Sequence, residues 1–160
     1  MTNTRPLRVY SDRSLCPGNA YVALLQAVWG AVPEDPEDPK SGRFDTFLEN
    51  GGTLFQAADI QTCDYGVLPF DYGFVIEGKL PLATAETFFE RLNRSGKKTL
   101  VFCWHDRDPA LNDDRIILFQ TAFERRRKQA DTHVLPIFIE PKSCNPKMRI
   151  DKSFLQLVSL

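Results

Sequence analysis

Hydrophobic residues along this chain gather in short continuous runs, separated by stretches in which they recur at helical spacing. The clearest runs cover Leu7–Tyr10 and residues 65–70, 98–104 and 115–120. Continuous apolar runs, in contrast to alternating ones, are typical of strands that are covered on both faces. Strands of this kind that alternate with helices indicate an α/β domain. The pattern therefore predicts a Rossmann-like, three-layer domain with a mostly parallel sheet.

The helical stretches lie between these runs. Apolar residues recur at helical spacing over residues 19–29, with Asn19 as a suitable N-cap and Gly30 as a suitable end. Residues 84–94 form the clearest predicted helix, with Thr84 as its cap. The remaining predicted segments are a proline-rich loop at 33–39, a short helix at 43–50 ended by Gly51 and Gly52, and a short strand at 53–55.

Composition excludes several classes of protein. The chain has 160 residues, about one domain. Its 20 Lys and Arg residues nearly balance 21 Asp and Glu residues, for a net charge of −1, which argues against a nucleic-acid binder. No apolar run approaches the roughly 20 residues that span a bilayer. Residues 1–6 lack the apolar stretch of a secretory signal, so we expect a cytoplasmic protein without a transmembrane segment.

The cysteines and histidines form no metal motif. Cys16, Cys63, Cys103 and Cys144 are widely spaced, and the only two histidines, His105 and His133, lie far apart. We expect four reduced thiols that serve as small, partly buried side chains, and no bound metal.

Polar residues follow three of the predicted strands. In open parallel sheets, ligands bind in the crevice beyond the carboxyl ends of the strands. His105 beside two carboxylates could act as a general base or contribute to a metal site, although residues of this kind also fit a plain polar turn. The candidate cleft residues are Asp12 after the first strand, Asp71 and Tyr72 after the third, and His105, Asp106 and Asp108 after the fourth.

One dense basic run lies at residues 124–128. Its Arg125, Arg126 and Arg127 are candidate anion-binding residues, because guanidinium groups match phosphate oxygens, but such a run is also typical of a solvated helix face. The glycine motifs of dinucleotide-binding and phosphate-loop proteins and the Gly-x-Ser-x-Gly motif of hydrolases are missing from the sequence. Their absence disfavours an oxidoreductase, a phosphate-loop enzyme and a hydrolase of that type.

Several segments, taken in order along the chain, form a pattern that no single one of them shows. They are Asp64-Tyr65-Gly66-Val67-Leu68-Pro69-Phe70-Asp71-Tyr72, the stretch from Gly96-Lys97 to His105-Asp106-Arg107-Asp108, the strand at 116–121, the basic run at 125–128, Leu135-Pro136-Ile137-Phe138-Ile139-Glu140, Val9-Tyr10-Ser11-Asp12 and Val28-Trp29-Gly30. Together these segments resemble the amino-terminal part of the exostosin-like glycosyltransferases of bacteria, and the similarity extends over roughly residues 7–141.

This resemblance implies one half of a GT-B glycosyltransferase active in polysaccharide biosynthesis. Residues 1–141 would be its Rossmann-like amino-terminal domain, which shapes the acceptor side, and 142–160 a linker or the start of a second domain. A nucleotide-sugar would be the substrate, a glycan or other sugar the acceptor, and no cofactor or metal is implied. Because a second domain or partner chain would bind the donor, we expect this chain alone, as a truncated enzyme, to be inactive.

The residues also fit a different class of protein. A non-catalytic Rossmann-like module could bind a partner protein or a small anion. In that case the polar residues after the strands would be turn chemistry, and the apolar stretch at 154–158 could mediate assembly.

Overall fold

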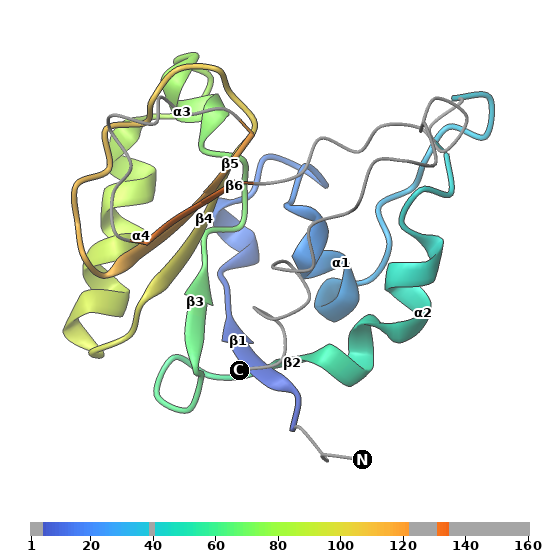
Figure 1. Ribbon diagram of the computed structural model, residues 1–160, viewed down its shortest axis with the longest axis horizontal. Coiled ribbons are helices and arrows are strands. Elements are labelled where there is room, and N and C mark those ends of the chain that lie inside the picture. Colours follow the sequence, from blue (N-terminus) through green and yellow to red (C-terminus); the bar gives the residue numbers. More distant parts are fainter. Residues whose placement is uncertain (1–4, 39–40, 122–130, 135–160) are drawn as a thin grey trace, which may run out of the picture. The chain divides into compact units, whose positions relative to one another are not determined.

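The protein folds around one parallel β-sheet (Figure 1). The computed structural model describes residues 5–38, 41–121 and 131–134, which all belong, apart from Arg5, to one compact unit, Pro6–Leu135. Within this part of the chain the sheet has six strands in the order β2-β1-β3-β4-β5-β6, and every neighbouring pair is parallel. The strands are β1 (Leu7–Tyr10), β2 (Phe55–Ala57), β3 (Tyr65–Val67), β4 (Thr99–Cys103), β5 (Ile116–Gln120) and β6 (Thr132–Val134).

Helices cover the two faces of this sheet. They are α1 (Ala23–Trp29), α2 (Asp45–Leu54), α3 (Gly73–Ile76) and α4 (Leu82–Arg94), with a short 3-10 turn, η1 (Arg13–Leu15), after β1. The segment leading into α1 and α1 itself cover one face with Tyr21, Val22 and Leu25, and α4 covers the opposite face. The predicted Rossmann-like α/β class with a parallel sheet is confirmed.

Neighbouring residues of one strand pack into the two hydrophobic cores on opposite faces of the sheet. Leu100 of β4 joins the cluster on the α1 side, whereas Val101 joins the cluster on the α4 side. In β5, Ile117 packs on the α1 side and Leu118 on the α4 side. Burial on both faces explains why these strands read as continuous apolar runs.

Helix α4 packs closely against β3. Its buried residues Ala85, Phe88, Phe89 and Leu92 recur at helical spacing. A Cβ atom at Gly66 of β3 would lie 2.1 Å from Leu92 Cδ1. Glycine is therefore the residue that lets the helix approach the sheet at this point.

The order of the strands creates a switch point. From β1 the chain crosses to β2 on one side, and then returns to β3 on the other side, from which β4, β5 and β6 follow. In open α/β sheets the crevice at such a point, outside the carboxyl ends of the strands, is the usual place for a ligand. Here that point lies between the ends of β1 and β3.

The start of α1 differs from the prediction. The helix begins at Ala23, because the Val22 amide donates to the Pro69 carbonyl at 2.9 Å and thereby ties the preceding segment to the chain after β3. Its predicted end is confirmed, since Gly30 has a φ of 97° and its amide donates to the Gln26 carbonyl.

Other boundaries also needed correction. Gly51 and Gly52 do not end α2, which continues to Leu54, so the short strand predicted at 53–55 begins only at Phe55. Helix α4 begins two residues before Thr84, with Pro81 at the N-cap. The run at 65–70 is a paired strand only to Val67, although the Leu68 amide still donates to the Leu100 carbonyl of β4.

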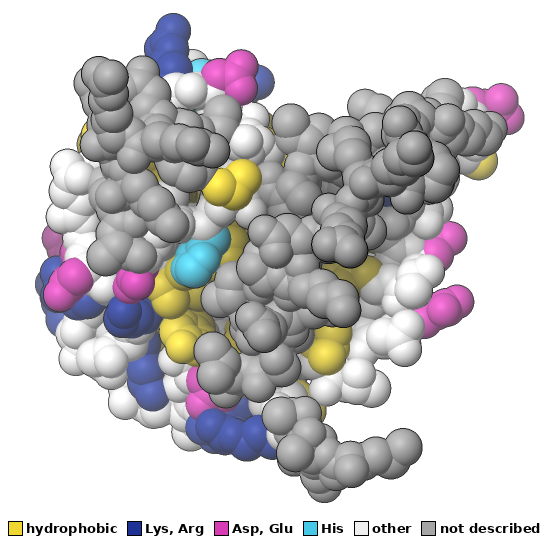
Figure 2. Space-filling model, in the orientation of Figure 1, with side chains coloured by type: hydrophobic (Ala, Val, Ile, Leu, Met, Phe, Trp, Pro, Cys, Tyr) yellow, Lys and Arg dark blue, Asp and Glu magenta, His cyan; other side chains and the backbone are white. Residues whose placement is uncertain are grey.

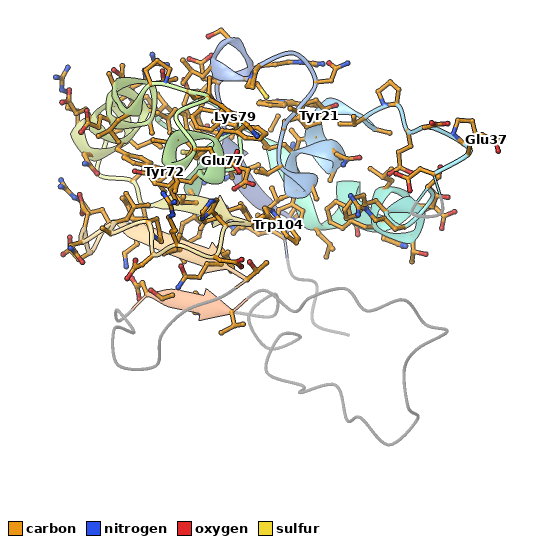
Figure 3. The ribbon with its side chains drawn as sticks, turned by 90° about the horizontal axis from the view of Figure 1, so that it is seen from above. Tyr21, Glu37, Tyr72, Glu77, Lys79 and Trp104 are labelled. Carbon is orange, nitrogen blue, oxygen red and sulfur yellow. The ribbon has the colours of Figure 1, made fainter. Side chains whose placement is uncertain are left out.

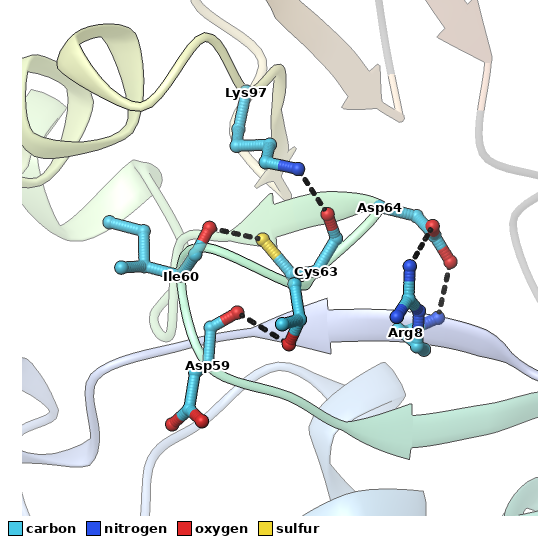
Figure 4. Close-up of polar contacts among 7 residues, drawn as sticks. Arg8, Asp59, Ile60, Cys63, Asp64 and Lys97 are labelled. Carbon is cyan, nitrogen blue, oxygen red and sulfur yellow. Dashed lines mark hydrogen bonds and ion pairs between the residues drawn. The ribbon is translucent and has the colours of Figure 1, made fainter.

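Polar contacts hold the opposite, amino-terminal edge of the sheet together (Figure 4). The Arg8 amide donates to Asp64 Oδ2 at 2.9 Å, and Arg8 Nη2 pairs with Asp64 Oδ1 at 3.2 Å. Lys97 Nζ donates to the Cys63 carbonyl at 2.7 Å, and the Cys63 thiol donates to the Ile60 carbonyl. These contacts join β1, the turn before β3 and the turn before β4.

Candidate functional site

The predicted cleft residues come from the ends of three neighbouring strands. Asp12 follows β1, Asp71 follows β3 and His105 follows β4, and β3 pairs with both β1 and β4. Because parallel strands end at one edge of a sheet, the fold brings these residues to the same edge. Figure 3 shows this part of the molecule from above, with Tyr72 and Trp104 labelled.

Asp12 is held in a network at the end of β1. Its Oδ1 accepts hydrogen bonds from the Ser14 hydroxyl at 2.6 Å and the Ser14 amide at 3.1 Å. Its Oδ2 pairs with Arg91 Nη1 of α4 at 2.6 Å, and Arg91 also donates to the Tyr10 hydroxyl. The Ser14 hydroxyl and then Arg91 hold the pKa of the Asp12 carboxyl below its usual range, against the opposing effect of burial. Both oxygens of this carboxylate already have donors.

Asp71 joins the turns that follow β3 and β4. Its Oδ1 accepts two backbone hydrogen bonds, from the Gly73 amide at 2.8 Å and from the Trp104 amide at 3.0 Å. No described residue donates a hydrogen bond to its Oδ2, and the Asp71 residue as a whole is half-buried. Asp71 therefore has one oxygen fixed by the fold and one available to a ligand.

Trp104 is an exposed aromatic residue at this edge, and it was not among the cleft residues predicted from the sequence. It directly follows β4 and 43% of its surface is exposed. The signal was present in the sequence, since a tryptophan that follows a buried strand lies where ligands of such sheets bind. Its backbone position is set by Asp71 Oδ1.

Tyr72 lies in the core. Only 4% of its surface is exposed, and its ring belongs to the hydrophobic cluster on the α4 side. Burial raises the pKa of the Tyr72 phenol, and the negative charge of Glu86 adds to this effect. The structure therefore places the adjacent residues Asp71 and Tyr72 in different roles, one at the edge and one in the core.

The segment after Trp104 is organised as a series of turns. His105 Nδ1 accepts the Arg107 amide at 2.9 Å, so the proton of the neutral ring lies on Nε2. Asp108 Oδ1 accepts the amide of Ala110, which has an unusual positive φ of 52°. Asp106 is exposed. These contacts fit the plain polar turn that the sequence left as an alternative to a general base.

Two further residues extend the edge from α3. Glu77, at the end of this helix, pairs with Lys79. The Lys79 ammonium, with a smaller contribution from His105, lowers the pKa of the Glu77 carboxyl. The contribution from His105 indicates that the α3 end and the turn after β4 are neighbours, and Figure 3 labels Glu77 and Lys79 near Tyr72.

The last residues of β4 and β5 add buried polar groups. Burial raises the pKa of the Cys103 thiol to about 11, which makes it a poor nucleophile. Gln120, which pairs with Cys103 across the two strands, is 3% exposed, and no described group donates to its Oε1. Cys16, Cys63 and Cys103 are free thiols, as expected for the three cysteines in the described part of the chain.

Some of the residues predicted from the sequence lie outside the described part of the chain. Arg125, Arg126 and Arg127 lie outside the described residues, as do Cys144 and the domain boundary at 141. Among the described residues, no group of three His, Cys, Asp or Glu side chains is arranged to hold a metal ion. A hollow of about 340 Å³ is lined by Gln26 and by residues of the loop and helix that follow, and includes none of the predicted cleft residues.

Figure 2 shows one face of the molecule, of which the described residues cover only part. Basic and acidic side chains are interspersed there over the described part of the molecule.

No helix in the described ranges has the length and apolar character to cross a membrane, the longest being α4 with 13 residues.

Comparison with known proteins finds no match for this chain among family models, curated proteins or solved structures. The function is therefore inferred from the fold and from the residues at the carboxyl edge of its sheet.

Proposed function

We propose that this chain is the acceptor-side domain of a glycosyltransferase similar to the exostosin-like enzymes. It would act with a donor-binding domain or partner chain to move a sugar from a nucleotide-sugar to a glycan or related acceptor. The observation that supports the proposal is the carboxyl edge of the sheet at the switch point, where a parallel sheet of this kind binds ligands. Asp12 follows β1 at this edge, and Asp71 accepts a hydrogen bond from the Trp104 amide there. We propose that this reaction takes place in the cytoplasm.

Sugar transfer requires two kinds of group. A base takes the proton of the acceptor hydroxyl while that oxygen attacks the sugar carbon, the bond from this carbon to phosphate breaks, and the nucleoside diphosphate leaves. Positive groups stabilise the leaving diphosphate. On this edge Asp71 offers an open carboxylate oxygen, and His105 a second polar group. In this proposal Arg125, Arg126 and Arg127 contact an anionic acceptor or the donor phosphates.

The proposal is tested on the native protein isolated from its source cells. Its intact mass shows whether the 160 residues are part of a longer chain. The native protein, with any partner that copurifies, is then assayed with UDP-, GDP- and dTDP-sugars for release of nucleoside diphosphate that depends on an oligosaccharide acceptor. We expect acceptor-dependent release with one donor class.

Two outcomes would count against the glycosyltransferase. The first is the absence of release with every donor class. The second is strong thermal stabilisation of the 160-residue chain by UDP alone, because the nucleotide belongs mainly to the other half of such an enzyme. Either result would favour the non-catalytic binding module.

A further inference from the structure

We propose that Trp104 and Asp71 form a subsite for a neutral sugar ring. The ring stacks on the exposed indole, and one of its hydroxyl groups donates a hydrogen bond to Asp71 Oδ2. This inference rests on the proposed function and deepens it, because it names the chemistry of the acceptor at this edge: a pyranose with an accessible C–H face and at least one hydroxyl on its rim.

Trp104 is an exposed aromatic residue. The other large hydrophobic residues that are exposed in the described part of the chain, Leu54, Leu82 and Val134, are aliphatic and lie on separate elements. An indole with 43% of its surface in water loses the free energy that its burial would supply. The axial C–H groups of a pyranose carry partial positive charge and fit the electron-rich face of an indole.

Asp71 contributes to both parts of the subsite, the hydrogen-bond acceptor and the position of Trp104. One oxygen accepts the Trp104 amide and the Gly73 amide, so the carboxylate and the backbone that carries the indole are held together. The other oxygen receives no hydrogen bond from a described residue. An acceptor that is already fixed loses little conformational freedom when a hydroxyl binds to it.

Most cationic side chains near this edge of the sheet already have a partner. Of the cations near this edge, Arg91 pairs with Asp12 and Lys79 with Glu77, whereas Arg107 is exposed and forms no ion pair with a described residue. Arg13 lies over the rings of Tyr21 and Trp29. Paired or stacked cations offer less to a phosphate than free ones, so Arg91, Lys79 and Arg13 fit a hydroxyl-rich neutral ligand better than a nucleotide. Arg107 is available to a phosphate, and the titration below therefore includes UDP.

The test uses Trp104 as its own reporter. The chain contains two tryptophans, so the Trp29→Phe variant leaves Trp104 as the only indole. The 160-residue chain with this change is titrated with cellotetraose, maltotetraose and chitotetraose at millimolar concentrations, and with UDP. We expect a saturable change in fluorescence with at least one oligosaccharide and a smaller one or none with UDP. No change with any of the three oligosaccharides overturns the proposal, and so does a response to UDP alone.

Two variants of Asp71 separate binding from positioning. Asp71→Asn keeps an oxygen for the two backbone amides but replaces the open oxygen with an NH2 group, so it should weaken oligosaccharide binding by about 10- to 100-fold at an unchanged unfolding midpoint. Asp71→Ala should also lower the midpoint, because two amides lose their acceptor. Leu82→Ala, an equally exposed hydrophobic change on α4, should leave binding unaltered. Full affinity in Asp71→Asn contradicts the proposal.

The outcome for the native enzyme distinguishes this inference from the proposed function. Sugar transfer with an unchanged acceptor KM in Trp104→Ala would overturn the subsite and leave the glycosyltransferase standing. Oligosaccharide binding at Trp104 without transfer to any acceptor would support the subsite and contradict the glycosyltransferase.

Discussion

At the scale of single residues, five aspartates that follow strands or begin turns form the same hydrogen bond. In each case one carboxylate oxygen accepts the backbone amide two residues further on, which stabilises a turn. The residues are Asp12, Asp35, Asp71, Asp108 and Asp113. Asp71 differs, because its Oδ1 also accepts an amide from the turn after another strand. Composition and local spacing do not reveal that difference.

Asp113 allows a test of this turn chemistry through pH. Its Oδ1 accepts the Arg115 amide and Nε at 2.9 Å, and hydrogen bonds from Arg115 lower the pKa of its carboxyl to about 2. A depressed folded-state pKa stabilises the protein above the ordinary pKa of about 4, and this contribution disappears as pH falls toward about 2. Asp113→Asn should therefore lower the free energy of unfolding at pH 7 by at most about 1 kcal/mol, since solvent reaches the ion pair through the half-exposed Arg115 side chain.

Urea unfolding at pH 7 and pH 2 measures this effect. The difference between the Asp113→Asn variant and the original protein should be present at pH 7 and much smaller at pH 2. Asp106→Asn, a change at an exposed carboxylate, serves as the control. A difference of equal size at both pH values would show that the pair is not the cause.

At the scale of elements, the ends of helices depend on tertiary packing. The boundaries of β1 were predicted correctly from its apolar run alone. The end of α2 was wrong because two glycines suggested a stop, whereas Gly51 serves to bring α2 against α1: a Cβ there would lie 2.5 Å from the Cβ of Ala27. A glycine that ends a helix and one that permits close packing look alike in a single sequence.

The two glycines of α2 therefore respond in opposite directions to the same change. Gly52→Ala should raise the free energy of unfolding by about 0.5 to 1 kcal/mol, because alanine favours the helix and nothing lies within 4 Å of the new Cβ. Gly51→Ala should lower it by about 1 to 3 kcal/mol, because the new Cβ overlaps Ala27. Denaturant unfolding of the two variants measures both effects.

The partner residue supplies the control for this pair. Ala27→Gly removes the methyl group that Gly51→Ala would meet, so the double variant should recover part of the loss. If Gly51→Ala is as stable as Gly52→Ala, the close approach of α1 and α2 is contradicted.

At the scale of the whole described unit, the sheet is stabilised from its centre. Strand β4 has partners on both sides and contributes Leu100 and Val101 to the two cores. Strand β2 pairs only with β1 within the described residues, and its Gln56 and Ala57 are exposed. Stability should therefore decrease from the central strands toward the β2 edge.

Amide hydrogen exchange measures this gradient. We expect the amides of β4 to exchange only on global unfolding, and those of β2 to exchange at least about 100-fold faster through local opening. The amides of β1, which has partners on both sides, should resemble those of β4. Equal protection of β2 and β4 would mean that the sheet opens as one unit, contrary to this expectation.

The sequence by itself determined the class of fold and the positions of most strands. A strand with helices on both faces has no face for polar residues, so continuous apolar runs report its presence directly. Only the tertiary structure decided which strand ends meet, because the partner of a parallel strand depends on the order of the crossovers and not on local pattern. That order sets β3 between β1 and β4, and so brings Asp71 to the amide of Trp104, 33 residues away. The chemistry of the candidate site follows from this neighbourhood.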